Sequence, residues 1–299
     1  MKLYAPAYYQ KFSCIAGDCR HSCCIGWEID VDKKALKKYK KLRDEAILAS
    51  VDTRDTPHFC LGEDERCPHL DERGLCRIIL SYGEGYLCDI CREHPRFYHD
   101  TPYGREVGLG MACEEAARII LSAEDYATFL EVGTEEGEAE PFDFDPIPSR
   151  ERIYGILAEE GLSLAKRMEA IEAAYGVSVR EHSNDAWRTL LDRLEYLSDA
   201  HRTLFACYTN DAPVRKENEP FLARALAYFV FRHVSDAKDG EEARGAIGFA
   251  LFATRLLAAI AGEKTEEGDV IEAARIISEE LEYSEENTEE IKWLFLEKR

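Results

Sequence analysis

The chain has 299 residues, of which 45% are hydrophobic, and this is enough for one or two buried cores. Its formal net charge of −21 at pH 7 would repel nucleic-acid phosphates, so we expect no nucleic-acid partner. The sequence contains no run of about 18 apolar residues to span a membrane, and residues 1–10 lack the apolar segment of a secretory signal. We therefore expect a cytoplasmic protein with reduced thiols and no membrane partner.

Residues 1–130 are predicted to form a loop-rich, cysteine-rich region that binds metal, because this stretch mixes turn-forming residues with short apolar patterns. The predicted elements are a helix over 31–50, a loop over 52–71 and a helix over 112–130. Asp30 or Asp32 can cap the first helix, because an aspartate oxygen accepts hydrogen bonds from the first free backbone N–H groups.

Residues 131–150 are predicted to form an acidic linker, rich in glutamate, proline and glycine. Residues 151–299 are predicted to form an acidic α-helical domain, a helical bundle. Its helices are expected over 149–175, 183–207, 220–234, 241–261, 270–281 and 288–296, the last capped by Thr288. The fold class is therefore mainly α, a loop-rich metal-binding region followed by a bundle. The acidic half suits a lysine-bearing partner, or serves only solubility.

Cysteines give the strongest chemical signal, because ten of the eleven lie between Cys14 and Cys113. Nine of them form four short groups and are predicted to be metal ligands: Cys14, Cys19, Cys23 and Cys24; Cys67 and Cys76; Cys88 and Cys91; and Cys113. A Cys-x2-Cys loop brings two sulfurs to one ion, and both zinc and iron–sulfur clusters accept such ligands. Nine sulfurs exceed the four that one centre needs, so one or two centres remain open. The alternative is that these are small buried residues or isolated reactive thiols.

An odd cysteine count and the vicinal Cys23-Cys24 pair fit a disulfide framework poorly. Cys60 and Cys207 stand apart from the groups and are predicted to be packing residues. Nearby histidines could add ligands or be ordinary loop residues: His21, His69, His94 and His99. The sequence contains no dinucleotide or phosphate-binding glycine loop, no nucleophile elbow and no Cys-x3-Cys-x2-Cys triplet of radical S-adenosylmethionine enzymes.

The order and spacing of these groups resemble one known family. The blocks that carry the resemblance are Tyr8-Tyr9-x2-Phe12-x-Cys14-x4-Cys19-x3-Cys23-Cys24-x2-Trp27, then Cys67-Pro68 with Cys76, then Cys88-x2-Cys91-x2-His94-Pro95-Arg96, and Cys113-Glu114-Glu115-Ala116-Ala117-Arg118. Together they cover roughly residues 4–121, and they are similar to the flagellin lysine-N-methylase family. The acidic half matches that family only in kind.

This resemblance implies a protein-lysine N-methyltransferase that uses S-adenosylmethionine, acts on flagellin and is associated with a four-iron iron–sulfur cluster. It implies no particular catalytic or S-adenosylmethionine-binding residues. Candidates for handling the lysine amine are Tyr8, Tyr9, Asp89, Glu93 and Glu106, each of which is otherwise an ordinary packed or solvated residue. Arg96 could bind a carboxylate, and Trp27 is expected in the core rather than as a platform for the sulfonium.

Two other classes of protein fit the same residues. One is a non-catalytic interaction module in which zinc or iron holds the fold and the acidic bundle docks a basic partner. The other is an electron-transfer protein, which would be reduced reversibly and would not bind S-adenosylmethionine. The metal that the protein contains would separate these classes, because a stoichiometric zinc site is colourless whereas an iron–sulfur cluster is brown.

Overall fold

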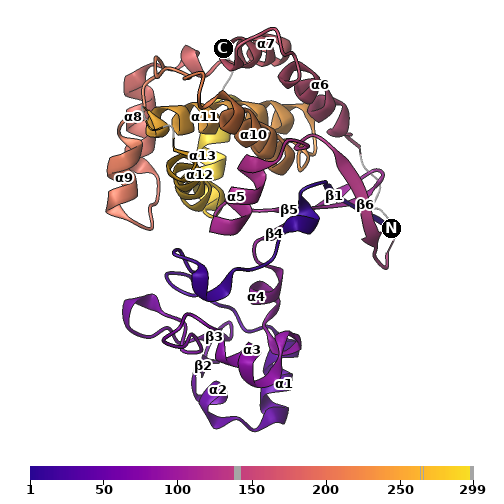
Figure 1. The fold of residues 1–299 in the computed structure, drawn as a ribbon, viewed down its shortest axis with the longest axis vertical. Coiled ribbons are helices and arrows are strands. Elements are labelled where there is room, and N and C mark those ends of the chain that lie inside the picture. Colours follow the sequence, from indigo (N-terminus) through magenta and orange to yellow (C-terminus); the bar gives the residue numbers. More distant parts are fainter. Residues whose placement is uncertain (138–142, 263, 265, 297–299) are drawn as a thin grey trace. The chain divides into compact units, whose positions relative to one another are not determined.

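The computed structural model describes residues 1–137, 143–262, 264 and 266–296 (Figure 1). The chain forms two compact units, which are described here one at a time. The larger unit consists of Met1–Phe12, Phe97–Ala112 and Ala116–Arg299, and the smaller unit consists of Ser13–Arg96 with Cys113–Glu115. This division differs from the predicted ranges 1–130 and 151–299, because the first strand of the chain belongs to the larger unit.

A four-stranded sheet in the larger unit explains that difference. Its strands are β1 (Lys2–Pro6), β4 (Arg96–Thr101), β5 (Gly104–Leu109) and β6 (Phe129–Thr134), in the order β4-β5-β1-β6. Strand β1 pairs parallel with β5, where Leu3 lies opposite Arg105, and antiparallel with β6. The mainly α prediction is therefore incomplete, since the structure is mixed.

Glycine at two positions of β5 permits this packing. Gly104 has a φ of +140°, and a Cβ there would lie 2.5 Å from the carbonyl oxygen of Lys2 in β1. A Cβ on Gly108 would lie 2.2 Å from the ring of Phe97 and 2.6 Å from that of Phe231. Only the residue without a side chain fits such close approaches.

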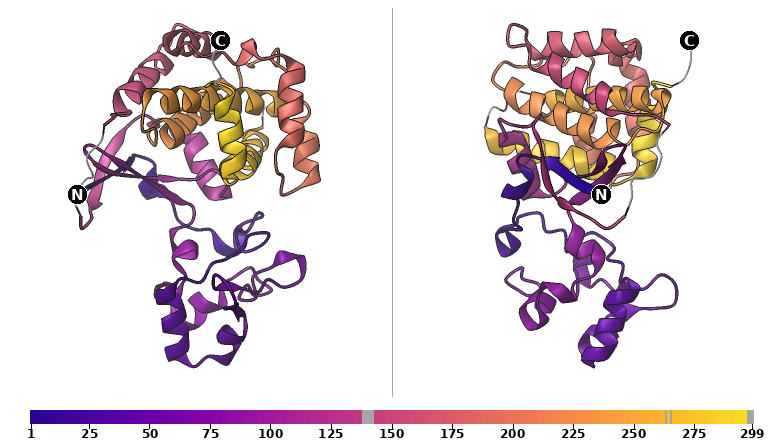
Figure 2. Two further views of the ribbon diagram at one scale, coloured as in Figure 1. Left: turned by 180° about the vertical axis from the view of Figure 1, so that it is seen from behind. Right: turned by 90° about the vertical axis from the view of Figure 1, so that its right-hand side faces the viewer.

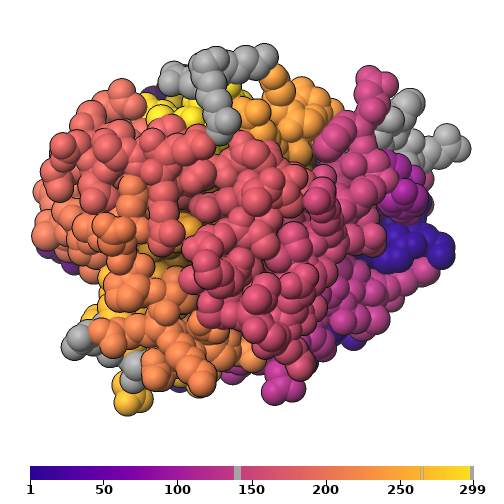
Figure 3. Space-filling view, turned by 90° about the horizontal axis from the view of Figure 1, so that it is seen from above, coloured from indigo at the N-terminus to yellow at the C-terminus, as the bar shows by residue number. Residues whose placement is uncertain are grey.

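Helices make up the rest of the larger unit, and the prediction of a mostly helical C-terminal part is confirmed. They are α5 (Glu114–Ser122, which begins in the smaller unit), α6 (Ile147–Leu157), α7 (Leu164–Tyr175), α8 (Asn184–Arg193), α9 (Asp199–Phe205), α10 (Glu219–Phe229), α11 (Gly240–Ala261), α12 (Glu267–Glu282) and α13 (Glu285–Trp293). The chain passes from α10 through a π-helical turn, Val230–Val234. Helix α11 contacts α7, α9, α10, α12 and α13, and the two views of Figure 2 show it among them. Figure 3 views the side formed largely by α6 to α9.

Several predicted boundaries are wrong in instructive ways. The predicted helices 149–175 and 183–207 are each two helices, and the predicted helix 112–130 ends at Ser122 before β6 begins. Gly176 adopts the left-handed conformation that ends α7. Thr288 does not cap the last helix, because α13 starts earlier and the side chain of Ser284 accepts from the Asn287 N–H.

The predicted acidic linker over 131–150 overlaps two regular elements. Its first four residues belong to β6, and its last four begin α6. Residues 138–142 of this range lie outside the described residues.

One helix, α11, is long and apolar enough to cross a membrane by length and composition alone. Of its apolar window, 89% is buried inside the protein. Within the part of the chain that the structure describes, no other helix meets these criteria. This degree of burial is that of the core helix of a bundle.

The smaller unit contains short elements around its own core. They are α1 (Lys33–Leu42), α2 (Glu45–Ala49), β2 (Val51–Asp52), β3 (His58–Phe59), α3 (Arg77–Tyr82) and α4 (Asp89–Glu93). The predicted helix 31–50 is interrupted at Arg43, whose φ of 55° is left-handed, and Asp44 starts α2 as a new N-cap. Asp32 caps α1 as predicted, accepting from the Lys34 and Ala35 N–H groups at 2.9 Å.

Candidate metal centre

All nine predicted cysteine ligands lie in the smaller unit. None of the chain's eleven cysteines, all of which the structure describes, is in a disulfide. Short elements fix several of these residues, since Cys76 and Cys88 precede α3 and α4, and Cys113 precedes α5. Whether these cysteines bind metal stays a prediction, but their positions separate them into two groups.

Five of the cysteines belong to the core of the smaller unit. Cys67 and Cys88 are buried in it, and three others pack against it, so we call the five the core thiols: Cys24, Cys67, Cys76, Cys88 and Cys91. The backbone N–H of Cys67 donates to the carbonyl of Cys24 at 2.8 Å. The hydroxyl of Tyr39 lies 3.3 Å from the Cys88 sulfur. Segments far apart in the sequence thus bring these sulfurs into one core.

The other four cysteines lie outside that core, and we call them the outer thiols: Cys14, Cys19, Cys23 and Cys113. Cys14 and Cys23 are exposed, whereas Cys19 and Cys113 are half-buried. Burial is the main cause that raises the pKa of Cys19, and the bond with Cys24 is the main cause for Cys23. The nearby Cys113 and Cys14 raise the pKa of both thiols further. The four outer thiols therefore form a second cluster of cysteines.

Glu114 connects the loop that contains Cys19 to the residue next to Cys113. Its carboxylate accepts from the backbone N–H groups of Arg20 at 2.9 Å and His21 at 3.3 Å, and from the Arg20 side chain at 2.9 Å. The Cys19 sulfur lies 3.8 Å from the same carboxylate. Because Glu114 follows Cys113 directly, these bonds hold the Cys19 loop beside Cys113. The sequence prediction missed this role, although the position of Glu114 next to a predicted ligand was a usable signal.

Hydrogen bonds between thiols and burial set their acidity. The bond between Cys23 and Cys24 lowers the pKa of Cys24 to about 7 and raises that of Cys23. In the same way, the bond from Cys91 lowers the pKa of Cys88 and raises that of Cys91. Burial raises the pKa of Cys67 to about 11. Each bonded pair can thus release one proton readily, and a thiolate is the form that binds metal.

The nine sulfurs suit a soft metal or an iron–sulfur cluster, whose ligands are thiolates. Among the described residues, only one group of three or more potential metal ligands has its ligand atoms within 4.8 Å of one another, namely His201, Glu279 and Glu280 in the larger unit. Hydrogen bonds explain this group, because Glu280 accepts from His201 and from the Leu197 N–H. Although two pairs of thiols are close enough to bond, no three of the cysteine sulfurs, all of which the structure describes, therefore lie within 4.8 Å of one another.

The four neighbouring histidines divide between the units. His99 lies in the larger unit, 3.4 Å from an Asp236 oxygen. In the smaller unit, His69 is buried against the ring of Phe59, with its Nε2 atom 2.9 Å from the Ser50 hydroxyl. His21 is exposed, and His94 ends α4 before a cis peptide bond to Pro95.

The prediction that Cys60 and Cys207 are packing residues is wrong, because both are exposed. Trp27 is half-buried rather than a core residue.

Three candidates for handling the lysine amine have local roles. Tyr8 is buried in the larger unit, and Glu106 there accepts two bonds from Arg150 at 2.6 and 2.8 Å.

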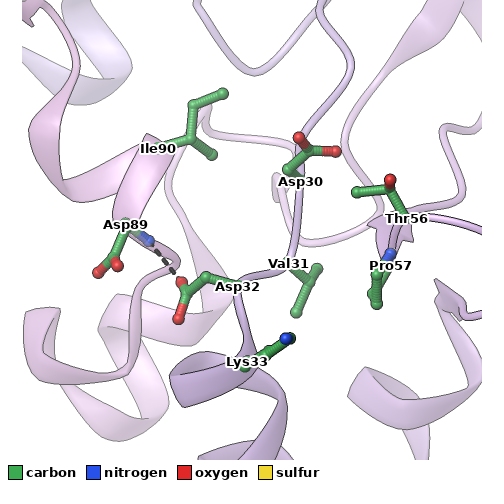
Figure 4. Close-up of a pocket in the computed structure, with 8 residues that line it drawn as sticks. All are labelled: Asp30, Val31, Asp32, Lys33, Thr56, Pro57, Asp89 and Ile90. Carbon is green, nitrogen blue, oxygen red and sulfur yellow. Dashed lines mark hydrogen bonds between the residues drawn. The ribbon is translucent and has the colours of Figure 1, made fainter.

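The third such candidate, Asp89, lines a pocket of about 350 Å³ in the smaller unit (Figure 4). The lining residues are Asp30, Val31, Asp32, Lys33, Thr56, Pro57, Asp89 and Ile90. The Asp89 carboxylate pairs with Arg92, and its N–H donates to Asp32 at 2.8 Å. These two aspartates therefore serve the local fold, and no cysteine is among the lining residues.

Comparison with known proteins identifies relatives of this chain. The flagellar biosynthetic protein FliU of Salmonella muenchen is 34% identical over an aligned length of 134 residues, and the match covers 40% of this chain and 77% of that protein. The chain belongs to the FliU family. Lysine-N-methylases of this family from Salmonella choleraesuis and Salmonella typhimurium are 35% and 34% identical over 134 residues. The chain spans about a third of the length of each, 32%. No protein-family model matches the chain, and no solved structure does.

Proposed function

We propose that this chain takes part in S-adenosylmethionine-dependent N-methylation of lysine side chains on flagellin, in the cytoplasm, with an iron–sulfur cluster held by cysteines of the smaller unit. The observation that carries the proposal is the meeting of nine cysteines from four separate stretches in one compact unit, without disulfides. The FliU-family relatives named lysine-N-methylase support the reaction, and the flagellar name of FliU supports the substrate.

Methyl transfer to lysine sets chemical requirements. The ε-amine must be neutral, because only its lone pair can attack the methyl carbon, and its ordinary pKa is about 10.4. In a direct displacement the nitrogen–carbon bond forms as the carbon–sulfur bond breaks, the electron pair leaves on sulfur, and the new ammonium loses a proton. The amine must lie in line with the methyl group, with water excluded.

The cysteines would hold the cluster, and the acidic charge would attract the substrate. A four-iron cluster takes up to four thiolates, which the outer thiols or the core thiols can supply. A cluster held by four thiolates has a ligand on every iron, whereas one held by only three thiolates of a group could offer an open iron to the amino and carboxylate groups of S-adenosylmethionine. The chain's net charge of −21 favours the approach of a surface rich in lysine.

Mass spectrometry of flagellin tests the proposal. Protein purified without oxygen is incubated with flagellin and S-adenosylmethionine, and lysine-containing peptides are then examined. The proposal predicts lysines heavier by one or more methyl groups, and none in a reaction without S-adenosylmethionine. Unchanged flagellin in the presence of protein with an intact cluster would remove the claim of activity.

A further inference from the structure

The nine cysteines divide into two groups that meet at the bonded Cys23–Cys24 pair, and this division has a consequence for metal content. The four outer thiols and the five core thiols have different surroundings, one at exposed loops and one in an apolar core. A tetrahedral zinc ion or a four-iron cluster takes up to four thiolates. Each group supplies four thiolates, and no cysteine is needed in both groups. Cys24 is the fifth core thiol, and it lies beside Cys23 of the outer group.

We propose that the smaller unit binds two separate thiolate-held metal centres, a closed one on the core thiols and an open one on the outer thiols. The inference rests on metal binding by these cysteines, as the proposed function does, but it does not depend on methyl transfer. It assigns the two groups different tasks, because a metal ligated by four thiolates is closed, whereas the more exposed outer group could hold a centre through three thiolates and leave a coordination position free.

The core group has the features of a structural site. Its five cysteines come from three of the four cysteine groups of the sequence, and they share a core with Ile29, Val31, Tyr39 and Phe59. The elements around this core are short, since α2 and α4 have five residues each. A small unit with so little regular structure gains much of its stability from a metal that ties its segments together.

The outer group has the features of an accessible site. Cys14 and Cys23 are exposed, and Cys19 is half-buried. The Glu114 bonds to Arg20 and His21 fix the loop from one side. A centre held here would be open to small molecules, whereas one on Cys67 and Cys88 would be covered by the core.

Metal analysis of matched cysteine variants tests the proposal. Iron, zinc and inorganic sulfide are measured per chain in anaerobic wild-type protein and in two double variants. The outer variant is Cys14→Ser with Cys19→Ser, and the core variant is Cys67→Ser with Cys88→Ser. The control, Cys60→Ser with Cys207→Ser, removes two exposed cysteines that belong to neither group.

The proposal predicts two centres in wild type and in the control. The outer variant should lose one centre, keep the other and unfold within a few degrees of wild type. If both centres are clusters, iron and sulfide fall by half; if the core holds zinc, iron is lost and zinc stays. The core variant should lose the core metal and unfold at a clearly lower temperature.

A single centre per wild-type chain would overturn the proposal, and so would loss of all metal from the outer variant. The outer variant decides the matter even if the core variant does not fold, because its substitutions lie at exposed or half-buried loops. A protein that does not transfer methyl groups would still show these metal contents. The metal analysis therefore tests this proposal separately from the proposed function.

Discussion

Glu114 forms several hydrogen bonds beside the predicted metal ligands, and their loss can be measured. Its side chain is 13% exposed and binds the Cys19–His21 loop through one side-chain and two backbone donors. We predict that Glu114→Ala destabilises the smaller unit by about 1–3 kcal/mol, because the donors lose a charged acceptor, and that iron is lost faster to a chelator. The exposed Glu72 in the same unit is the control, and equal effects of Glu72→Ala would contradict this role.

His233 is predicted to make the larger unit sensitive to mild acid. Burial lowers its pKa to about 4, although Glu282 lies 2.8 Å from its Nε2 atom and opposes the shift. Below pH 6.5 the His233 side chain is protonated in the unfolded chain but stays neutral in the folded one. The free energy of unfolding therefore falls as the pH drops toward 4, by up to about 3 kcal/mol. Urea unfolding at pH 7 and pH 5 should show a smaller loss in His233→Gln than in wild type. An equal loss in both would contradict the prediction.

At the scale of elements, α11 depends on close packing against the end of the chain. A Cβ on Gly248 would lie 2.2 Å from the ring of Phe295, whereas one on Gly155 in α6 would meet nothing within 4 Å. We predict that Gly248→Ala destabilises the protein by about 1–3 kcal/mol through overpacking. Gly155→Ala should instead be neutral or stabilising by up to about 1 kcal/mol, because alanine favours helix. Thermal unfolding measures the change in stability of both variants. If the two substitutions changed stability in the same direction, the predicted clash with Phe295 would be refuted.

Sequence-based prediction succeeded for elements that neighbouring residues determine. It failed for elements that depend on pairing between distant segments of the chain. The Asp32 cap and the end of a helix at residue 175 follow from neighbouring residues, so both agree with the structure. Strand β6 was predicted as helix or linker, because its pairing with β1 joins residues over 120 positions apart, as for Leu3 and Gly133. The cysteine spacings marked the candidate ligands, but their division into two groups depends on which sulfurs reach the core.

At the scale of the whole molecule, the two units should respond differently to removal of metal. The larger unit has an extensive apolar core around α11, while the smaller unit has short elements around its thiols. We predict that a chelator under reducing conditions unfolds the smaller unit and leaves the larger one folded. Hydrogen exchange would show loss of protection within residues 13–96 and retained protection in α11. Equal protection before and after chelation would contradict a structural role for the metal.

The function proposed above requires that methylation of flagellin lysines depend on a cluster held by the clustered cysteines. The most direct measurement compares methyl incorporation into flagellin lysines by anaerobic protein, by metal-depleted protein and by the same sample after iron and sulfide are restored. The account predicts transfer in the first, loss in the second and recovery in the third. Equal transfer in all three, or none in the presence of a full cluster content, would contradict it.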